Sequence, residues 1–138
     1  MIPDGLVRKV ASQVGVAGLA RVMAGLVLCL LLACPAAWGQ DLSGVYRVEG
    51  LDAGYRGTLT MRPAGATYLL EWRLTAGESY RGVALLTGNV LASNWVAGKT
   101  NGVVVYEIEP GGRILNGTYT SMNNVGVVQR ERLTFLRR

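Results

Sequence analysis

Hydrophobic and polar residues alternate along most of the chain from residue 43 to the C-terminus. Clusters of Gly, Pro and Asn interrupt the alternation roughly every 8–12 residues, a pattern typical of an all-β protein with short turns. The pattern predicts eight strands, at residues 43–49, 55–62, 67–75, 79–87, 90–96, 102–109, 113–120 and 127–136. Because the intervening turns are short, consecutive strands should pair antiparallel and run up and down.

One face of these predicted strands carries nearly all of the aromatic residues. If Trp72 points inward, the alternation places all six Tyr, the single Phe and Trp95 on the same inward face. An aromatic face shared by eight short strands favours a sheet that closes on itself, since closure removes exposed strand edges. The predicted fold is an all-β, eight-stranded, up-and-down antiparallel barrel, with a β-sandwich as the alternative.

Small residues recur among the large inward ones. The triplet Tyr-Arg-Gly occurs twice, ending at Gly57 and at Gly82, and Gly117 occupies an inward position further along the chain. A glycine inside a strand lets the strand coil tightly and leaves space for a neighbouring ring. We interpret these glycines as devices for bending a barrel wall.

The first 39 residues have the composition of an export signal. Three basic residues precede an uncharged apolar run at residues 22–33 (VMAGLVLCLLLA), and small residues follow the run. This order is typical of a secretory signal peptide, and the run is shorter than the ~20 residues that a membrane-spanning helix needs. We predict a signal peptide at 1–39, cleavage before Gln40, and a secreted or periplasmic barrel domain at 40–138.

Two other readings of this N-terminal region stay open. Residues 31–34 (LLAC) resemble a bacterial lipobox, in which Cys34 would become a lipidated N-terminus that anchors the domain to the cell envelope. The apolar run could also form a single membrane anchor helix, although its length argues against this.

The composition of the predicted domain excludes several kinds of chemistry. Both cysteines, Cys29 and Cys34, lie before residue 40, and the chain has no His. The domain therefore has no means to build a Ser–His, Cys–His or zinc site, and its sequence holds no phosphate loop or nucleophile elbow. We predict neither an enzyme nor a metal or cofactor site. Eleven basic residues against eight acidic ones in this part of the chain give too little positive charge to predict nucleic-acid binding.

The inward aromatic residues are the candidate ligand-binding residues. An eight-stranded barrel is either filled by side chains or hollow enough for one small ligand, and both alternatives stay open here. Glu131 also points inward, where a carboxylate needs partners; it is either a polar anchor for a ligand or a rim residue bonded to a Tyr hydroxyl. If the interior is a pocket, its predicted lining is Tyr46, Tyr68, Trp72, Tyr80, Trp95, Tyr106, Tyr119 and Glu131.

The outward face of the middle strands is unusually apolar. The predicted outward residues that form a candidate partner or self-association surface are Val83, Leu85, Val103 and Val105. Contiguous exposed apolar residues favour such a surface, although a shifted register would bury them. The earlier strands instead present several Arg interleaved with Thr and Glu, which is typical of a solvated face.

Several segments of the predicted domain also carry a family resemblance. They are residues 44–50 (GVYRVEG), 55–58 (YRGT), 68–72 (YLLEW), 105–108 (VYEI), 112–119 (GRILNGTY) and 131–133 (ERL). In these segments the chain resembles small exported proteobacterial proteins that are loosely labelled fibronectin-binding or left uncharacterised. Tyr119 stands where this group would be expected to have a Trp. The resemblance implies a surface or periplasmic binding module and supplies no binding residues; the expected barrel is also similar in shape to calycins and avidin, which does not imply a ligand.

The sequence therefore predicts an exported binding module. Its partner would be an extracellular protein or polymer on the outer sheet, or a small apolar or aromatic ligand inside the barrel. The alternative is a non-catalytic envelope module that acts through self-association, as a homo-oligomer.

Overall fold

The computed structural model describes residues 40–138, so the predictions of a signal peptide, of lipidation at Cys34 and of an anchor helix lie outside the described residues. The described part contains strands β1 (Gly44–Gly50), β2 (Arg56–Ala64), β3 (Thr67–Leu74), β4 (Ser79–Thr87), β5 (Val90–Ala97), β6 (Thr100–Ile108), β7 (Ile114–Ser121) and β8 (Gln129–Arg137). Each predicted strand is present, with its ends within two residues of the predicted ones.

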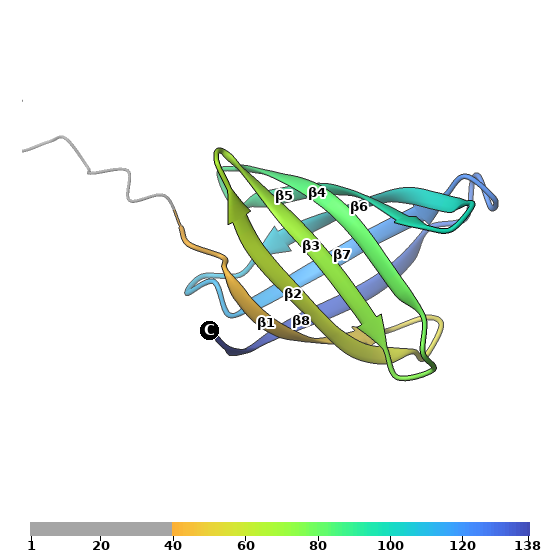
Figure 1. The fold of residues 1–138 in the computed structure, drawn as a ribbon, viewed down its shortest axis with the longest axis horizontal. Coiled ribbons are helices and arrows are strands. Elements are labelled where there is room, and N and C mark those ends of the chain that lie inside the picture. The colour runs from red at the N-terminus through yellow and green to blue at the C-terminus, as the bar shows by residue number, and fades with distance from the viewer. Residues whose placement is uncertain (1–39) are drawn as a thin grey trace, which may run out of the picture. The chain divides into compact units, whose positions relative to one another are not determined.

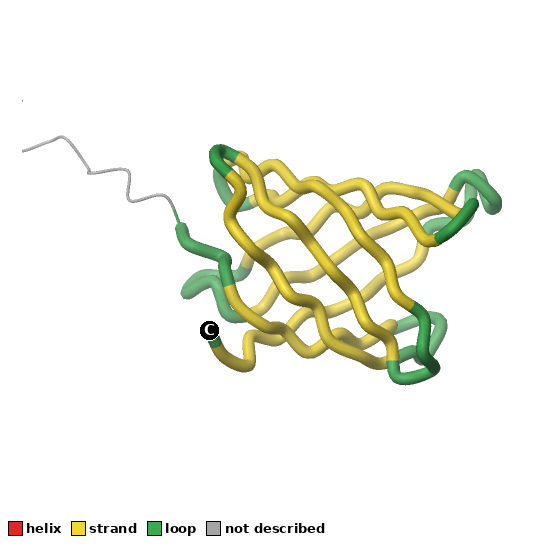
Figure 2. The backbone as a smooth tube through the Cα atoms, in the orientation of Figure 1, coloured by secondary structure: helices red, strands yellow, loops and turns green. Residues whose placement is uncertain are grey.

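The eight strands form a closed antiparallel barrel in which every strand pairs with its neighbours in the chain and β8 pairs back with β1. Figure 1 shows the strands wrapping obliquely around the barrel, and Figure 2 shows that short loops make every connection. The predicted up-and-down barrel is confirmed, and closure by the β1–β8 pairing excludes the sandwich alternative. Because the strands alternate in direction, the turns β1–β2, β3–β4, β5–β6 and β7–β8 share one end of the barrel. Gln40, where the described residues begin, the C-terminus and the other three turns share the other end.

The predicted inward face is also the observed one. Inward residues of adjacent strands pair directly, for example Tyr46 with Leu59 and Leu59 with Trp72. The buried apolar core consists of Leu42, Tyr46, Val48, Leu59, Met61, Leu70, Trp72, Ala84, Leu91, Val104, Tyr106, Ile108, Leu115 and Leu133. Burial of apolar area on this scale is what holds a disulfide-free domain together.

Two inward glycines leave space for large aromatic rings. The sequence analysis predicted this role for inward glycines and named Gly117 among them. A Cβ at Gly117 would lie 2.6 Å from the ring of Tyr106, and a Cβ at Gly102 would lie 2.6 Å from the indole of Trp95. Any larger residue at either position would displace a ring from the barrel interior. The two glycines thus let Tyr106 and Trp95 lie flat against the wall.

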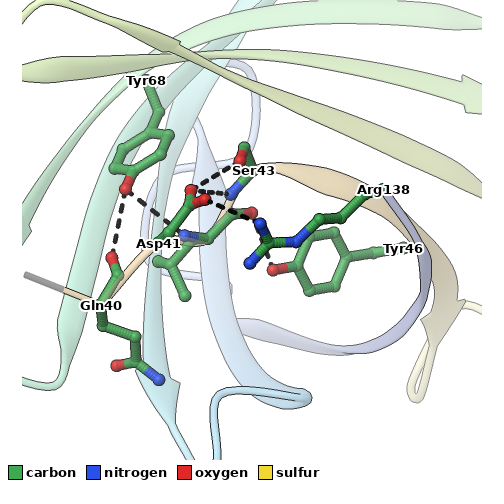
Figure 3. A network of polar contacts seen from close by, with 7 residues as sticks. Gln40, Asp41, Ser43, Tyr46, Tyr68 and Arg138 are labelled. Atoms are coloured by element: carbon green, nitrogen blue, oxygen red, sulfur yellow. Dashed lines mark hydrogen bonds and ion pairs between the residues drawn. The ribbon is translucent and has the colours of Figure 1, made fainter.

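The segment before β1, residues 40–43, fills the end of the barrel that holds the β2–β3, β4–β5 and β6–β7 turns. Leu42 is 1 % exposed although it belongs to no strand. The hydroxyl of Tyr46 donates to the carbonyl oxygen of Leu42 at 2.8 Å, and the hydroxyl of Tyr68 donates to the carbonyl oxygen of Gln40 at 3.2 Å. Figure 3 shows this network, in which Asp41 also forms an ion pair with Arg138 at 3.5 Å. Two interior tyrosines therefore hold the N-terminal segment in place.

Candidate functional site

A cavity of about 390 Å³ occupies the other end of the barrel, where the β1–β2, β3–β4 and β7–β8 turns lie. It is lined by Ala53, Tyr55, Trp72, Leu74, Glu78, Tyr80, Trp95, Val104, Tyr119, Thr120, Ser121, Asn124, Val127, Gln129 and Glu131. Volumes of this order are typical of pockets for small molecules. The interior is thus divided between a packed half and a hollow half, so neither of the two simple alternatives describes it completely.

The eight residues predicted to line a pocket are divided between these two halves of the barrel. Five of the eight line the cavity, namely Trp72, Tyr80, Trp95, Tyr119 and Glu131. Tyr106 is fully buried and contacts Glu131 from within the core. Tyr46 and Tyr68 lie at the filled end, where they hold the N-terminal segment, so they are not part of the cavity.

Glu131 on β8 is the buried acidic residue of the cavity, at 5 % exposure. Its carboxylate oxygen Oε2 accepts a 2.6 Å hydrogen bond from the hydroxyl of Tyr55, and its Oε1 accepts one from the hydroxyl of Tyr106. The carboxylate is therefore bonded to Tyr hydroxyls, as one of the two readings offered by the sequence requires, and Glu131 also lines the cavity. Buried carboxylates require such donors, because an unpartnered one loses its hydration without compensation.

Burial raises the pKa of Glu131 above its ordinary value, and the hydroxyls of Tyr106 and Tyr55 partly oppose that rise. Burial also raises the pKa of Tyr55 and of Tyr106 well above the usual range, and the adjacent Glu131 carboxylate adds to this effect. Both phenols therefore keep their protons at physiological pH and act as hydrogen-bond donors.

Aromatic rings form much of the cavity wall in two edge-to-face pairs. Tyr80 and Trp95 lie with ring centroids 5.6 Å apart, and Tyr55 and Tyr119 with centroids 6.2 Å apart. Such pairs fix the orientation of each ring and so give the wall a defined shape. The hydroxyl of Tyr80 donates to Glu78 at the β3–β4 turn, and burial together with this contact raises the pKa of Tyr80 to about 12.

Two important cavity residues were not among the predicted lining. Tyr55 lies in the β1–β2 turn, and its ring folds back so that a Cβ on Gly50 would lie 2.6 Å from it. Glu78 lies in the β3–β4 turn next to the start of β4. The alternation had placed Tyr55 on the inward face, although the predicted pocket lining did not include it. Strand alternation does not determine where a turn residue such as Glu78 points.

The predicted outer surface is exposed as expected. Together with Leu69 and Ala92, which pair with its members across the sheet, it forms an outer apolar patch on β3–β6. The patch consists of Leu69, Val83, Leu85, Ala92, Val103 and Val105; the exposed fractions of Val83, Leu85, Val103 and Val105 are 48 %, 59 %, 54 % and 43 %. The register that places these residues outside is therefore correct.

No group of three or more His, Cys, Asp or Glu side chains in residues 40–138 could hold a metal ion. No helix in the same range is long and apolar enough to cross a membrane.

The fold and the cavity together define a small up-and-down β-barrel that is filled at one end and hollow at the other. No family model matches the chain, and no curated protein is similar to it. Among solved structures, a fatty acid transporter described as REP1-NXSQ is 11 % identical, covers 71 % of this chain and 98 % of its own, and has a TM-score of 0.47. Apo lipid binding protein 8 of Caenorhabditis elegans is 14 % identical, covers 68 % and 94 % of the two chains, and has a TM-score of 0.44.

Proposed function

We propose that this protein is a binding protein that holds one small, largely apolar ligand in the hollow end of its barrel. The observation that carries the proposal is the cavity of about 390 Å³, whose wall includes the rings of Tyr55, Trp72, Tyr80, Trp95 and Tyr119. Pockets for small molecules combine such apolar walls with a few fixed polar groups. Glu131, with its two tyrosine donors, provides a fixed polar group of this kind.

The same cavity does not favour catalysis. Residues 40–138 contain no His or Cys, and both oxygens of Glu131 already accept hydrogen bonds from phenols that keep their protons. General-base catalysis also needs a nucleophile that the base can activate, and the described lining of the cavity offers no His, Cys or Lys to act with Glu131. We therefore propose binding without turnover.

A variant that fills the cavity tests this proposal. Ser121 on β7 lines the cavity, whereas Thr118 on the same strand is exposed on the outer face. We expect Ser121→Phe to weaken binding of a neutral probe, 1-naphthol, by about tenfold or more because the added ring occupies the space of the probe. Thr118→Phe should leave that affinity unchanged. Quenching of tryptophan fluorescence measures both, because Trp72 and Trp95 lie in the cavity wall.

The outcomes of this titration are distinct. Binding of 1-naphthol that Ser121→Phe removes and Thr118→Phe preserves supports an interior ligand site. Saturable binding that both variants retain would place the site elsewhere, and no saturable binding to the folded wild type would contradict the proposal. Native mass spectrometry of protein purified from its own host would show whether a small molecule is retained.

We also propose that the barrel acts outside the cytoplasm. The apolar run at residues 22–33, with basic residues before it and small residues after it, supports export, and the resemblance to exported proteobacterial proteins agrees with it. The intact mass of the purified protein tests the route. A chain that begins at Gln40 supports cleavage by signal peptidase, added acyl mass on Cys34 supports an envelope anchor, and an unprocessed chain contradicts export.

The outer apolar patch supports a second candidate function, association with another copy or with an extracellular protein. Exposed apolar patches on soluble domains commonly mark such surfaces. We expect the double variant Val83→Ser, Val103→Ser to shift any dimer towards monomer, measured by sedimentation equilibrium. Val125→Ser is the control, because Val125 is 78 % exposed in the β7–β8 turn, away from the patch. A wild type that stays monomeric at millimolar concentration would contradict self-association.

A further inference from the structure

The charges around the cavity are unbalanced. Two carboxylates line it, Glu131 within and Glu78 at the β3–β4 turn, while its described lining includes no Lys or Arg. The two basic residues that flank Glu131 on β8 point outward: Arg130 forms an ion pair with Asp52 at 2.9 Å, and Arg132 donates to Asn116 at 3.2 Å. An incoming ligand thus meets negative charge that no basic side chain of the lining compensates.

We propose that the ligand is an organic cation, a substituted ammonium group attached to a small apolar body. This inference rests on the proposed function, because it specifies the chemical class of the ligand bound in the same cavity. It follows from three features taken together: the aromatic wall, the two carboxylates, and the absence of basic side chains from the lining that the structure describes.

The aromatic wall suits a cation. The π-face of Trp or Tyr attracts an ammonium group within about 6 Å of the ring centroid, and the attraction is strongest where water is excluded. Trp72 is 5 % exposed, and Tyr80 and Trp95 are held in a fixed edge-to-face pair. Preorganised rings of this kind can surround a substituted ammonium, which is bulky and weakly hydrated.

Glu131 retains the capacity to face that cation. A carboxylate has about four lone-pair positions, of which the hydroxyls of Tyr55 and Tyr106 take two. These two hydrogen bonds fix the carboxylate and partly oppose the effect of burial, which raises the pKa of Glu131. A bound ammonium then provides the opposite charge that a buried carboxylate otherwise lacks.

The same arrangement rejects anions. The carboxylate of a fatty acid would enter a site that already holds Glu131 and Glu78, and no Arg or Lys of the described lining could pair with it. Like charges in a poorly solvated site repel strongly, so specificity here would come from repulsion as well as attraction.

Three probes with the same alkyl chain test the inference: octyltrimethylammonium, 1-octanol and octanoate. We expect the purified wild-type protein at neutral pH to bind the ammonium at least about tenfold more tightly than octanol, and octanoate most weakly.

Glu131→Gln should weaken ammonium binding by about tenfold and leave octanol binding within about twofold. Glu78→Gln, at the exposed turn, should have a smaller effect in the same direction. Glu107→Gln is the control, because it removes the same charge from the outer face of β6.

Calorimetry at matched ionic strength measures the affinity of the protein for each of the three probes. The results distinguish failure of this inference from failure of the proposed function. Octanol binding with no preference for the ammonium, or with a preference for octanoate, would overturn the cation inference and leave the proposed function standing. Absence of binding by all three probes to folded protein would overturn both. The comparison of probes uses the wild type, so it remains decisive even if Glu131→Gln does not fold. If Glu107→Gln weakens ammonium binding as much as Glu131→Gln does, the preference for the ammonium arises from the net charge of the protein. That result would contradict the inference.

Discussion

Replacing Leu42 by Ala is expected to lower the free energy of unfolding by about 2–5 kcal/mol, the usual cost of truncating a fully buried leucine. Leu42 precedes β1, yet only 1 % of its surface is exposed. Its backbone is tied to the barrel by the hydroxyl of Tyr46, which donates to its carbonyl oxygen at 2.8 Å. The backbone around position 42 is therefore held in place and cannot readily collapse into the space left by the missing side chain.

Urea unfolding monitored by tryptophan fluorescence measures this loss. Leu51→Ala is the matched control, because Leu51 lies in the β1–β2 turn and is 49 % exposed, and its truncation should cost well under about 1 kcal/mol. Equal stabilities of Leu42→Ala and wild type would show that the N-terminal segment is not part of the core. A cleaved or lipidated N-terminus must in either case leave Leu42 in the chain, since both predicted processing points precede it.

The strands of this barrel could be predicted because one rule governs them all. Side chains alternate between the two faces of a strand, and every strand of a closed barrel turns one of these faces to the interior. Trp72 therefore sets the register for every other strand, and the inward positions of Tyr106, Tyr119 and Glu131 follow from it. The exposed apolar residues Val83 and Val103 followed from the same register.

The segment before β1 escaped this rule. Leu42 enters the interior from that irregular segment, where backbone turns rather than alternation decide the direction of a side chain. Tyr55 was predicted to point inward, but its position in the β1–β2 turn beside the cavity did not follow from the pattern. The pattern also treats all inward residues as equivalent, so it did not separate Tyr46 and Tyr68 at the filled end from Tyr80 and Tyr119 at the hollow end. That separation depends on which end of the barrel receives the N-terminal segment.

The sequence could not decide whether the barrel is filled or contains a cavity, and the reason is physical. Whether eight strands enclose a hollow depends on how far each ring reaches across the interior, and therefore on side-chain rotamers and on close contacts such as that of Tyr106 with Gly117. Composition shows that the rings are inside and does not show how they pack.

Replacing Tyr106 by Phe is expected to destabilise the barrel by about 1–3 kcal/mol at neutral pH, because the Glu131 carboxylate then keeps only one of its two donors. The cost should depend on pH. Glu131 titrates near 4.5 in the unfolded chain and at a higher pH in the barrel, where burial raises its pKa. Above pH 4.5 and up to the folded pKa, the barrel binds more protons than the unfolded chain, so Glu131 makes the barrel less stable as the pH rises. Above the folded pKa this penalty is constant.

Loss of the Tyr106 hydroxyl removes a donor that lowers the pKa of Glu131, so the folded pKa rises further and the penalty at neutral pH grows. Denaturant unfolding at pH 4 and pH 7.5 should therefore show a larger difference between Tyr106→Phe and wild type at pH 7.5. Tyr46→Phe is the control, since Tyr46 is equally buried but donates to a backbone carbonyl at the filled end. The charge of Asp41 acts on Tyr46, and hydrogen bonds with Ser43 lower the pKa of Asp41, so its protonation is shifted away from this pH window and the cost of Tyr46→Phe should change less with pH. A cost of Tyr106→Phe that is the same at both pH values would show that Glu131 does not depend on this hydroxyl for its charge.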